Sequence, residues 1–139
     1  MAGSFSDYLE LKILDWLLGG VAFTPPATYY AALYTVAPSD SGGGTEVSTG
    51  VWTNYARVAI TKDQTNFPAA AAGGIANGAL IDFGTAAITG TAPVVAAIAL
   101  LDASSAGNLI VWADLTASKT INNDDPVTVP IGSLAITLG

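Results

Sequence analysis

Apolar residues near the N-terminus recur at the spacing of an amphipathic helix. The residues on this stripe are Phe5, Leu9, Ile13, Trp16 and Leu17. Ser4 or Ser6 can cap the helix by accepting a backbone N–H bond, and Asp7 lies near the positive end of its dipole. Gly19-Gly20 favours an end to the helix, because glycine adopts the left-handed C′ conformation at little cost. The pattern predicts one helix over residues 5–18.

The second half of this predicted helix, residues 11–18, is apolar on nearly every side. Lys12 and Asp15 are the interruptions. A helix of this kind has more apolar surface than one sheet face covers. Two interpretations remain open: the helix plugs the end of its own sandwich, or it is a docking element for a neighbouring subunit.

From residue 28 onward the period of the pattern changes from helix to strand. Short runs rich in Val, Ile, Tyr and Thr alternate with clusters of Gly, Pro, Asn, Asp and Ser. Short strands that follow one another with no helix between them indicate an antiparallel sandwich or barrel over residues 28–139. The whole chain, residues 1–139, is expected to form one domain. The predicted strands are Thr28–Thr35, Ala56–Thr61, Ala79–Phe83, Val94–Leu101, Leu109–Leu115, Thr120–Ile121, Val127–Val129 and Leu134–Leu138, with a weaker one near Gly74–Asn77.

Strict alternation assigns faces to several of these strands. In the first, Tyr30 and Tyr34 share one face and Tyr29 the other. The segment after residue 108 places two sets of residues on opposite faces: Leu109, Val111, Ala113 and Leu115 against Ile110, Trp112 and Asp114. The final strand is expected to turn Leu134, Ile136 and Leu138 to one face.

The segments between the predicted strands contain residues that favour turns. Residues 102–108 (Asp-Ala-Ser-Ser-Ala-Gly-Asn) predict a hairpin loop, and Asn122-Asn-Asp-Asp125 predicts a turn before Pro126 opens a strand. A long glycine-rich loop runs from Pro38 to about Tyr55. Trp52 and Tyr55 lie at its end, where they either anchor a partner or fill the core.

Composition excludes most catalytic chemistry. The chain of 139 residues has no histidine and no cysteine, so a Ser-His-Asp triad, a Cys-His pair and a thiolate or imidazole metal site cannot form. Eleven acidic residues lie mostly in predicted turns and on the helix, with no spacing that pairs two of them for acid–base work. We therefore expect no enzyme activity, no cofactor and no metal.

Charge also limits the partners. The formal net charge is −7, and the four basic residues form no run, which argues against nucleic-acid binding. No apolar run approaches the roughly 20 residues that span a bilayer, so no membrane partner is expected. Residues 122–125 offer oxygen ligands for calcium but lack the spacing of a calcium loop, and a turn explains them better. Because 51% of the residues are hydrophobic, part of the surface is expected to be covered by another protein, unless Ser, Thr, Asn and Gly supply the solvent face.

Several short motifs occur together in a characteristic order. They are Ser6-Asp-Tyr-Leu-Glu10 at the helix start, Tyr30-Ala-Ala-Leu-Tyr-Thr35, Gly44-Thr-Glu-Val-Ser48, Tyr55-Ala-Arg57, Phe83 before a Gly-Thr-Ala step, Leu101-Asp-Ala-Ser-Ser-Ala-Gly-Asn-Leu109 and Leu134-Ala-Ile-Thr-Leu138. In this order the chain resembles, nearly end to end, small structural proteins of tailed bacteriophages, often labelled tail-fibre-like. Relatives of that group include jelly-roll cement or decoration proteins of the capsid.

The resemblance implies a jelly-roll-like antiparallel β-sandwich with one N-terminal helix. It implies a cement protein on the outer surface of the capsid that contacts the major capsid protein and forms a homodimer or other small homo-oligomer. The alternative is a tail-fibre or receptor-binding module that contacts host-surface glycans. The residues expected at a partner interface are Phe5, Tyr8, Trp16, Trp52 and Tyr55.

Overall fold

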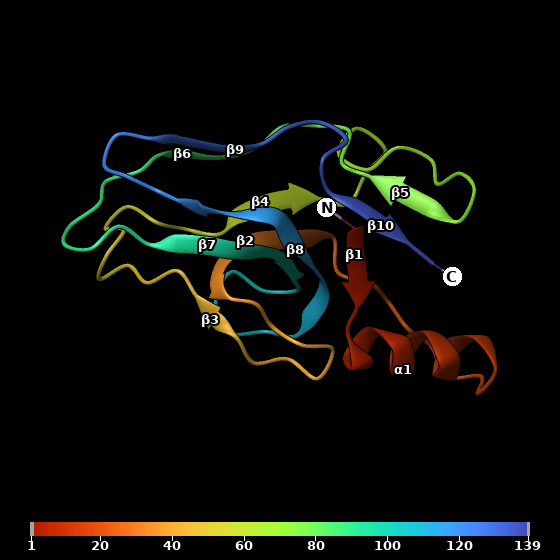
Figure 1. The fold of residues 1–139 in the computed structure, drawn as a ribbon. Helices are drawn as coiled ribbons and strands as arrows, with labels where there is room; N and C mark the ends of the chain where they lie inside the picture. The colour runs from red at the N-terminus through yellow and green to blue at the C-terminus, as the bar shows by residue number, and fades with distance from the viewer. Residues whose placement is uncertain (1, 139) are drawn as a thin grey trace.

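The computed structural model describes residues 2–138 and is built mostly of strands (Figure 1). One helix, α1 (Asp7–Leu17), precedes most of the sheet. The strands are β1 (Ala2–Phe5), β2 (Thr28–Val36), β3 (Thr45–Glu46), β4 (Val58–Thr61), β5 (Gly74–Ala76), β6 (Ile81–Thr85), β7 (Val94–Leu101), β8 (Leu109–Thr120), β9 (Pro126–Val129) and β10 (Ala135–Thr137). The predicted class, an all-β sandwich with one N-terminal helix, is confirmed.

The strands form two layers. β2, β7 and β8 pair antiparallel at the centre of one sheet, which continues through β1 and β10 to β5 and has β3 and β4 beyond β2. β6 and β9 form a separate antiparallel pair, which Figure 1 shows running across the other side of the core. The jelly-roll connectivity stays a prediction.

Strand β1, which the sequence pattern did not reveal, connects two parts of the large sheet. Ala2 and Gly3 pair in parallel with β10, whereas Ser4 and Phe5 pair antiparallel with β8. Because one four-residue strand is bonded to both, the β5–β10 segment is held beside the β2–β7–β8 platform. The start of α1 follows immediately and is fixed by the same strand.

Alternation along β2 divides the interior into two clusters. Ala31 and Leu33 belong to the main core between the layers, and Ala32 and Tyr34 belong to a smaller cluster on the outer face. Tyr29 packs against the main core, so its separation from Tyr34 is confirmed.

The face assignment at the start of β8 is wrong because the strand contains a bulge. Leu100 pairs with Val111 but the next residue, Leu101, pairs with Leu109, so Ile110 is an extra residue. Leu109 consequently joins the outer cluster with Trp112, while Ile110 and Val111 both enter the main core. The two strands predicted near residues 109–115 and 120–121 are one continuous strand to Thr120.

Helix α1 is capped by Ser6 and covers Asp7–Leu17, so Phe5, which was predicted at the start of the helix, lies in β1 instead. The Oγ of Ser6 accepts a hydrogen bond from the backbone N–H of Leu9 at 3.2 Å, and its own hydroxyl donates to the carbonyl of Leu109 on β8. At the other end the C-cap is Leu18, and the glycine in the left-handed region is Gly20, with a φ of 70°, rather than Gly19 directly after the cap. Within residues 2–138 no helix is long and apolar enough to cross a bilayer.

The predicted hairpin loop and turn are both present. Asp102 accepts hydrogen bonds from the backbone and side-chain nitrogens of Asn108, both at 2.7 Å. Asp125 accepts from the backbone N–H of Asn122 at 2.8 Å, as the turn interpretation requires. The strand near residues 134–138 covers residues 135–137; Leu134 and Ile136 are buried, whereas Leu138 lies past its end and is exposed.

Asn77 is buried at the junction of β5, β9 and β10. Its side-chain amide donates to the carbonyls of Ala79 at 2.8 Å and Pro130 at 2.9 Å, and its side-chain oxygen accepts from the N–H of Leu134 at 2.9 Å. Asn77→Ala would leave three backbone groups without these partners. We expect a loss of about 2–3 kcal/mol in the free energy of unfolding, measured by urea denaturation.

Gln64→Ala is the matched control, because Gln64 is an exposed amide for which no hydrogen bond is found among residues 2–138. Its unfolding free energy should stay within about 0.5 kcal/mol of the wild type. Equal stability of the two variants would show that Asn77 does not hold this junction together.

Candidate functional surfaces

The five residues expected at a partner interface fall into two groups. Phe5 and Tyr8 are partly buried where β1 and α1 meet the core, and Trp16 is 56% exposed. Trp52 and Tyr55 lie in the core, with 0% and 9% exposure. Of the two alternatives for Trp52 and Tyr55 the core is the one found, so their expected place at a partner interface is wrong, while an interface role for Phe5, Tyr8 and Trp16 stays a prediction.

Trp52 is buried because the loop that carries it folds back onto the sandwich. Its backbone N–H donates to the carbonyl of Ser48 at 2.9 Å, and Thr53 next to it donates to Ala87 at 2.9 Å. The Trp52 ring lies 5.4 Å from the ring of Tyr55, which stacks on Phe83. The indole N–H has no hydrogen-bond acceptor among residues 2–138. Glycine and polar residues along the loop hid this packing from the sequence pattern.

Most of α1 faces away from the protein. Leu9 is the one buried residue of the helix, and Ile13 packs partly against the core. The later turns of α1 project beyond the sheets, as Figure 1 shows. Trp16 and Leu17, which belong to the predicted apolar stripe, are therefore exposed. The exposed large apolar residues of the helix and the segment after it are Leu11, Leu14, Trp16, Leu17, Leu18 and Val21. The helix therefore does not plug its own sandwich along its second half.

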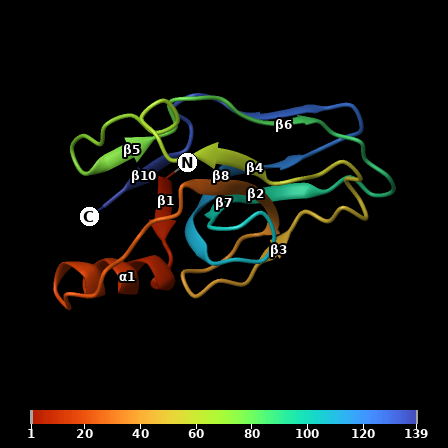
Figure 2. The same cartoon turned by 180° about the vertical axis from the view of Figure 1, so that it is seen from behind.

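A second apolar surface lies at the same end of the molecule. Figures 1 and 2 both place β5 and β10 at the end from which α1 projects. Ile131 and Leu138 are exposed there, beside a shallow trough of about 440 Å³ lined largely by Ala and Gly. Residues 64–81 and 126–138 carry no charged side chain. We call this surface, the exposed face of α1 together with the β5–β10 trough, the apolar end.

The surface around Arg57 differs from the apolar end, because it is polar and its groups are joined by hydrogen bonds. Its guanidinium forms a bidentate ion pair with Glu46, with Nε–Oε1 and Nη2–Oε2 distances of 3.0 and 2.8 Å. Its remaining Nη1 donates to the carbonyls of Ala103 at 2.7 Å and Ala106 at 2.8 Å in the β7–β8 hairpin loop. Bidentate pairing of this kind is strong and specific in geometry. We call Glu46, Tyr55 and Arg57 the loop clamp.

Tyr55 connects the loop clamp to the sheet. Its hydroxyl donates to Glu46 at 3.0 Å and accepts from the N–H of Leu33 at 2.9 Å. Burial raises the pKa of Tyr55 above its ordinary value, and the hydrogen bond to Glu46 holds the pKa of Arg57 up, so the phenol is neutral and the guanidinium charged at neutral pH. Three of the sequence motifs, around residues 44–48, 55–57 and 101–109, thus meet in one network whose evident role is to hold loops.

A hollow of about 370 Å³ lies beside the loop clamp. Ser48, Thr49, Ser104 and Ser105 present hydroxyl groups along it. Tyr55 contributes to the wall but is buried, so the hollow does not offer an open aromatic face for a sugar ring to stack on.

A family model described as podophage GP4 fiber I protein gp80 matches residues 4–137. The match spans nearly the whole chain, and the chain belongs to this family. No curated protein matches it in a sequence comparison. The protein is therefore a small structural protein of tailed phages, tail-fibre-like, and a component of the virion. The family description favours the fibre alternative over the capsid-cement hypothesis.

The raised pKa of Tyr55 predicts how stability depends on pH. In the unfolded chain the phenol ionises near pH 10, whereas the folded protein keeps its proton to higher pH. The stabilisation is therefore complete below about pH 10 and is lost as the pH rises above it. Tyr55→Phe should lower the unfolding free energy at pH 7 by about 1–3 kcal/mol, because Leu33 and Glu46 lose a partner.

Urea denaturation between pH 7 and pH 11 measures both effects. The fall in stability above pH 10 should be shallower in Tyr55→Phe than in the wild type, with a residual slope from Tyr29 and Tyr34, whose pKa values burial also raises. Parallel profiles for the two proteins would contradict this role of Tyr55.

Proposed function

We propose that this member of the podophage fibre family is a structural subunit of the fibre that attaches to its neighbours through the apolar end. The observation that carries the proposal is the exposure of α1: Leu14, Leu17 and Leu18 are 53%, 64% and 79% exposed. Soluble monomers rarely expose a contiguous apolar surface of this kind, and such patches usually mark interfaces.

The energetics favour a covered state for the apolar end. Full burial of one Leu side chain contributes about 1.5–3 kcal/mol, and the exposed face of α1 offers several such side chains. Part of that gain offsets the lost freedom of two associating bodies and the ordering of side chains. Burial of the trough along with the helix face would add to the gain.

A second copy of the chain supplies a matching surface. Bulky side chains protrude from α1, and the trough over the paired strands β5 and β10 is lined by small residues such as Ala71 and Gly74. The absence of charge along residues 64–81 and 126–138 means that Asp15 and Glu10 on the helix would meet no like charge there. Because both surfaces lie at one end, a two-fold contact would cover both in each copy.

Two other roles fit the structure less well. A capsid cement that binds the major capsid protein also needs an exposed contact surface, but the fibre description of the family gives it no support. Glycan recognition by Trp52 and Tyr55 would need rings that solvent can reach, and both rings are buried. Glycan contact elsewhere on the fibre stays a prediction.

The proposal predicts the effect of removing apolar side chains from α1. In Leu14→Ser/Trp16→Ser both changes are at exposed positions, so the protein should remain folded with a similar melting temperature. We expect the wild type to be a homo-oligomer by light scattering and the double variant to dissociate at least tenfold more readily, because each lost apolar contact weakens association. In phage complemented with the variant, copies per virion should fall at least tenfold.

Val36→Ser is the matched control, since Val36 is 58% exposed but lies at the end of β2 beside β3. It should assemble as the wild type does. Antibody labelling of wild-type virions should mark the fibres, with a small number of copies per particle. Labelling spread over the head at hundreds of copies would establish the cement role instead, and normal assembly of the double variant would show that α1 is not the contact.

A further inference from the structure

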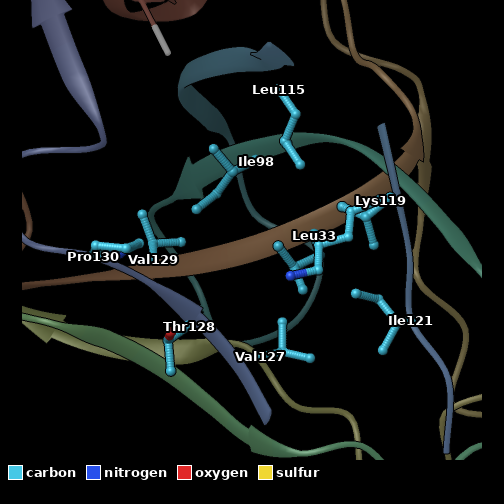
Figure 3. Close-up of a pocket in the computed structure, with 10 residues that line it drawn as sticks. Leu33, Ile98, Leu115, Lys119, Ile121, Val127, Thr128, Val129 and Pro130 are labelled. Carbon is cyan, nitrogen blue, oxygen red and sulfur yellow. The ribbon is translucent and has the colours of Figure 1, made fainter. Parts of the chain in front are cut away.

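A cavity of about 110 Å³ lies inside the sandwich where β7 and β8 face β9 (Figure 3). Its inner wall is aliphatic and buried, and consists of Leu33, Val95, Ile98, Ile121 and Val129. Its rim includes Lys119, Thr128 and Pro130, which are exposed. The cavity thus has an apolar interior and a partly polar opening to solvent.

An irregularity in β8 accounts for the cavity. Val95 pairs with Lys119 and Ala97 pairs with Asp114, so four residues of β8 stand opposite a single residue of β7. The extra length makes β8 leave the regular sheet over residues 115–118. Bulges of this kind redirect side chains and occur often beside functional sites.

The pairing of Lys119 with Val95 determines the direction of the lysine. Directly opposed residues of an antiparallel pair present their side chains on the same face, and Val95 is buried in the main core. Lys119 is therefore on the inward face, and Figure 3 shows its side chain directed toward the cavity that the ten residues drawn there line. No carboxylate lies within ion-pair distance of it among residues 2–138.

An inward lysine near a sheet edge also discourages pairing with another strand, which is a purely structural role. That role requires neither a cavity nor a buried aliphatic wall beside the ammonium group. Lys119 and the cavity together form a site in which one cation lies beside an apolar recess. Water is a poor occupant of the recess, because a bound water needs two or more polar partners and the inner wall provides none.

We propose that this cavity binds a small amphipathic carboxylate, with the alkyl chain in the recess and the carboxylate on the Lys119 ammonium. A dry cavity of about 150 Å³ holds a benzene molecule, so the volume here suits an alkyl chain of about four carbons. The cation selects a carboxylate over an alcohol of the same length, because a charge-assisted hydrogen bond is stronger than a neutral one. The inference is independent of the apolar end and of the proposed fibre role.

Titration of the full chain with pentanoate, followed by methyl NMR, tests the proposal. Chemical-shift changes should be confined to the lining methyl groups, such as those of Ile98 and Ile121, with a dissociation constant on the order of millimolar. Pentan-1-ol should bind about fivefold to tenfold more weakly. Lys119→Gln should remove the preference for pentanoate and leave the affinity for pentan-1-ol unchanged.

Two further variants separate the site from general effects. Lys12→Gln removes an equal charge from α1, where Lys12 lies over the ring of Tyr8, and should preserve the preference. Val127→Phe should fill the recess and abolish binding of both molecules; if this variant does not fold, the Lys119→Gln titration and the location of the shifts still decide. Shifts spread over other surfaces, or an unchanged preference in Lys119→Gln, would overturn the proposal.

Discussion

The arrangement of this protein depends on the double pairing of β1. Two residues of this strand bond to β10 and two to β8, so one short segment holds the β5–β10 part of the sheet beside the central platform. Ser6 follows directly and links the first turn of α1 to β8 through its hydroxyl. The helix is fixed at its first turn and contacts the core again only partly, at Ile13, so its last turn, with Leu14, Trp16 and Leu17 exposed, projects from the sandwich. The same pairing therefore brings the helix and the uncharged trough to one end.

Polar bonding and apolar exposure are divided between different parts of the molecule. Around Arg57, nearly every polar group of the loop clamp has a partner, and the loops there are held against the sheet. At the apolar end Leu14, Trp16 and Leu17 of α1 are each more than half exposed. A subunit with rigid loops and an unsatisfied apolar surface is suited to permanent assembly, which is what a virion structural protein requires.

The sequence predicted those helices and strands that are long enough to show a clear period of apolar residues. Alternation and turn residues located β2, β7 and the hairpin after Leu101, and capping residues located α1. β1 and β3 were missed because four and two residues are too short to show a period. The faces near Leu109 were wrong because a bulge inserts one residue, a feature set by the partner strand. The burial of Trp52 follows from how distant segments of the chain pack, which the local spacing of residues does not reveal.

If the protein assembles as proposed, the apolar end is covered in the particle. Hydroxyl-radical footprinting of intact virions, compared with the isolated protein under conditions that dissociate it, measures this directly at Trp16. We expect strong protection of Trp16 and of the exposed Leu residues of α1 in the virion, with Val36 labelled equally in both states. Equal labelling of Trp16 in virion and isolated protein would contradict it.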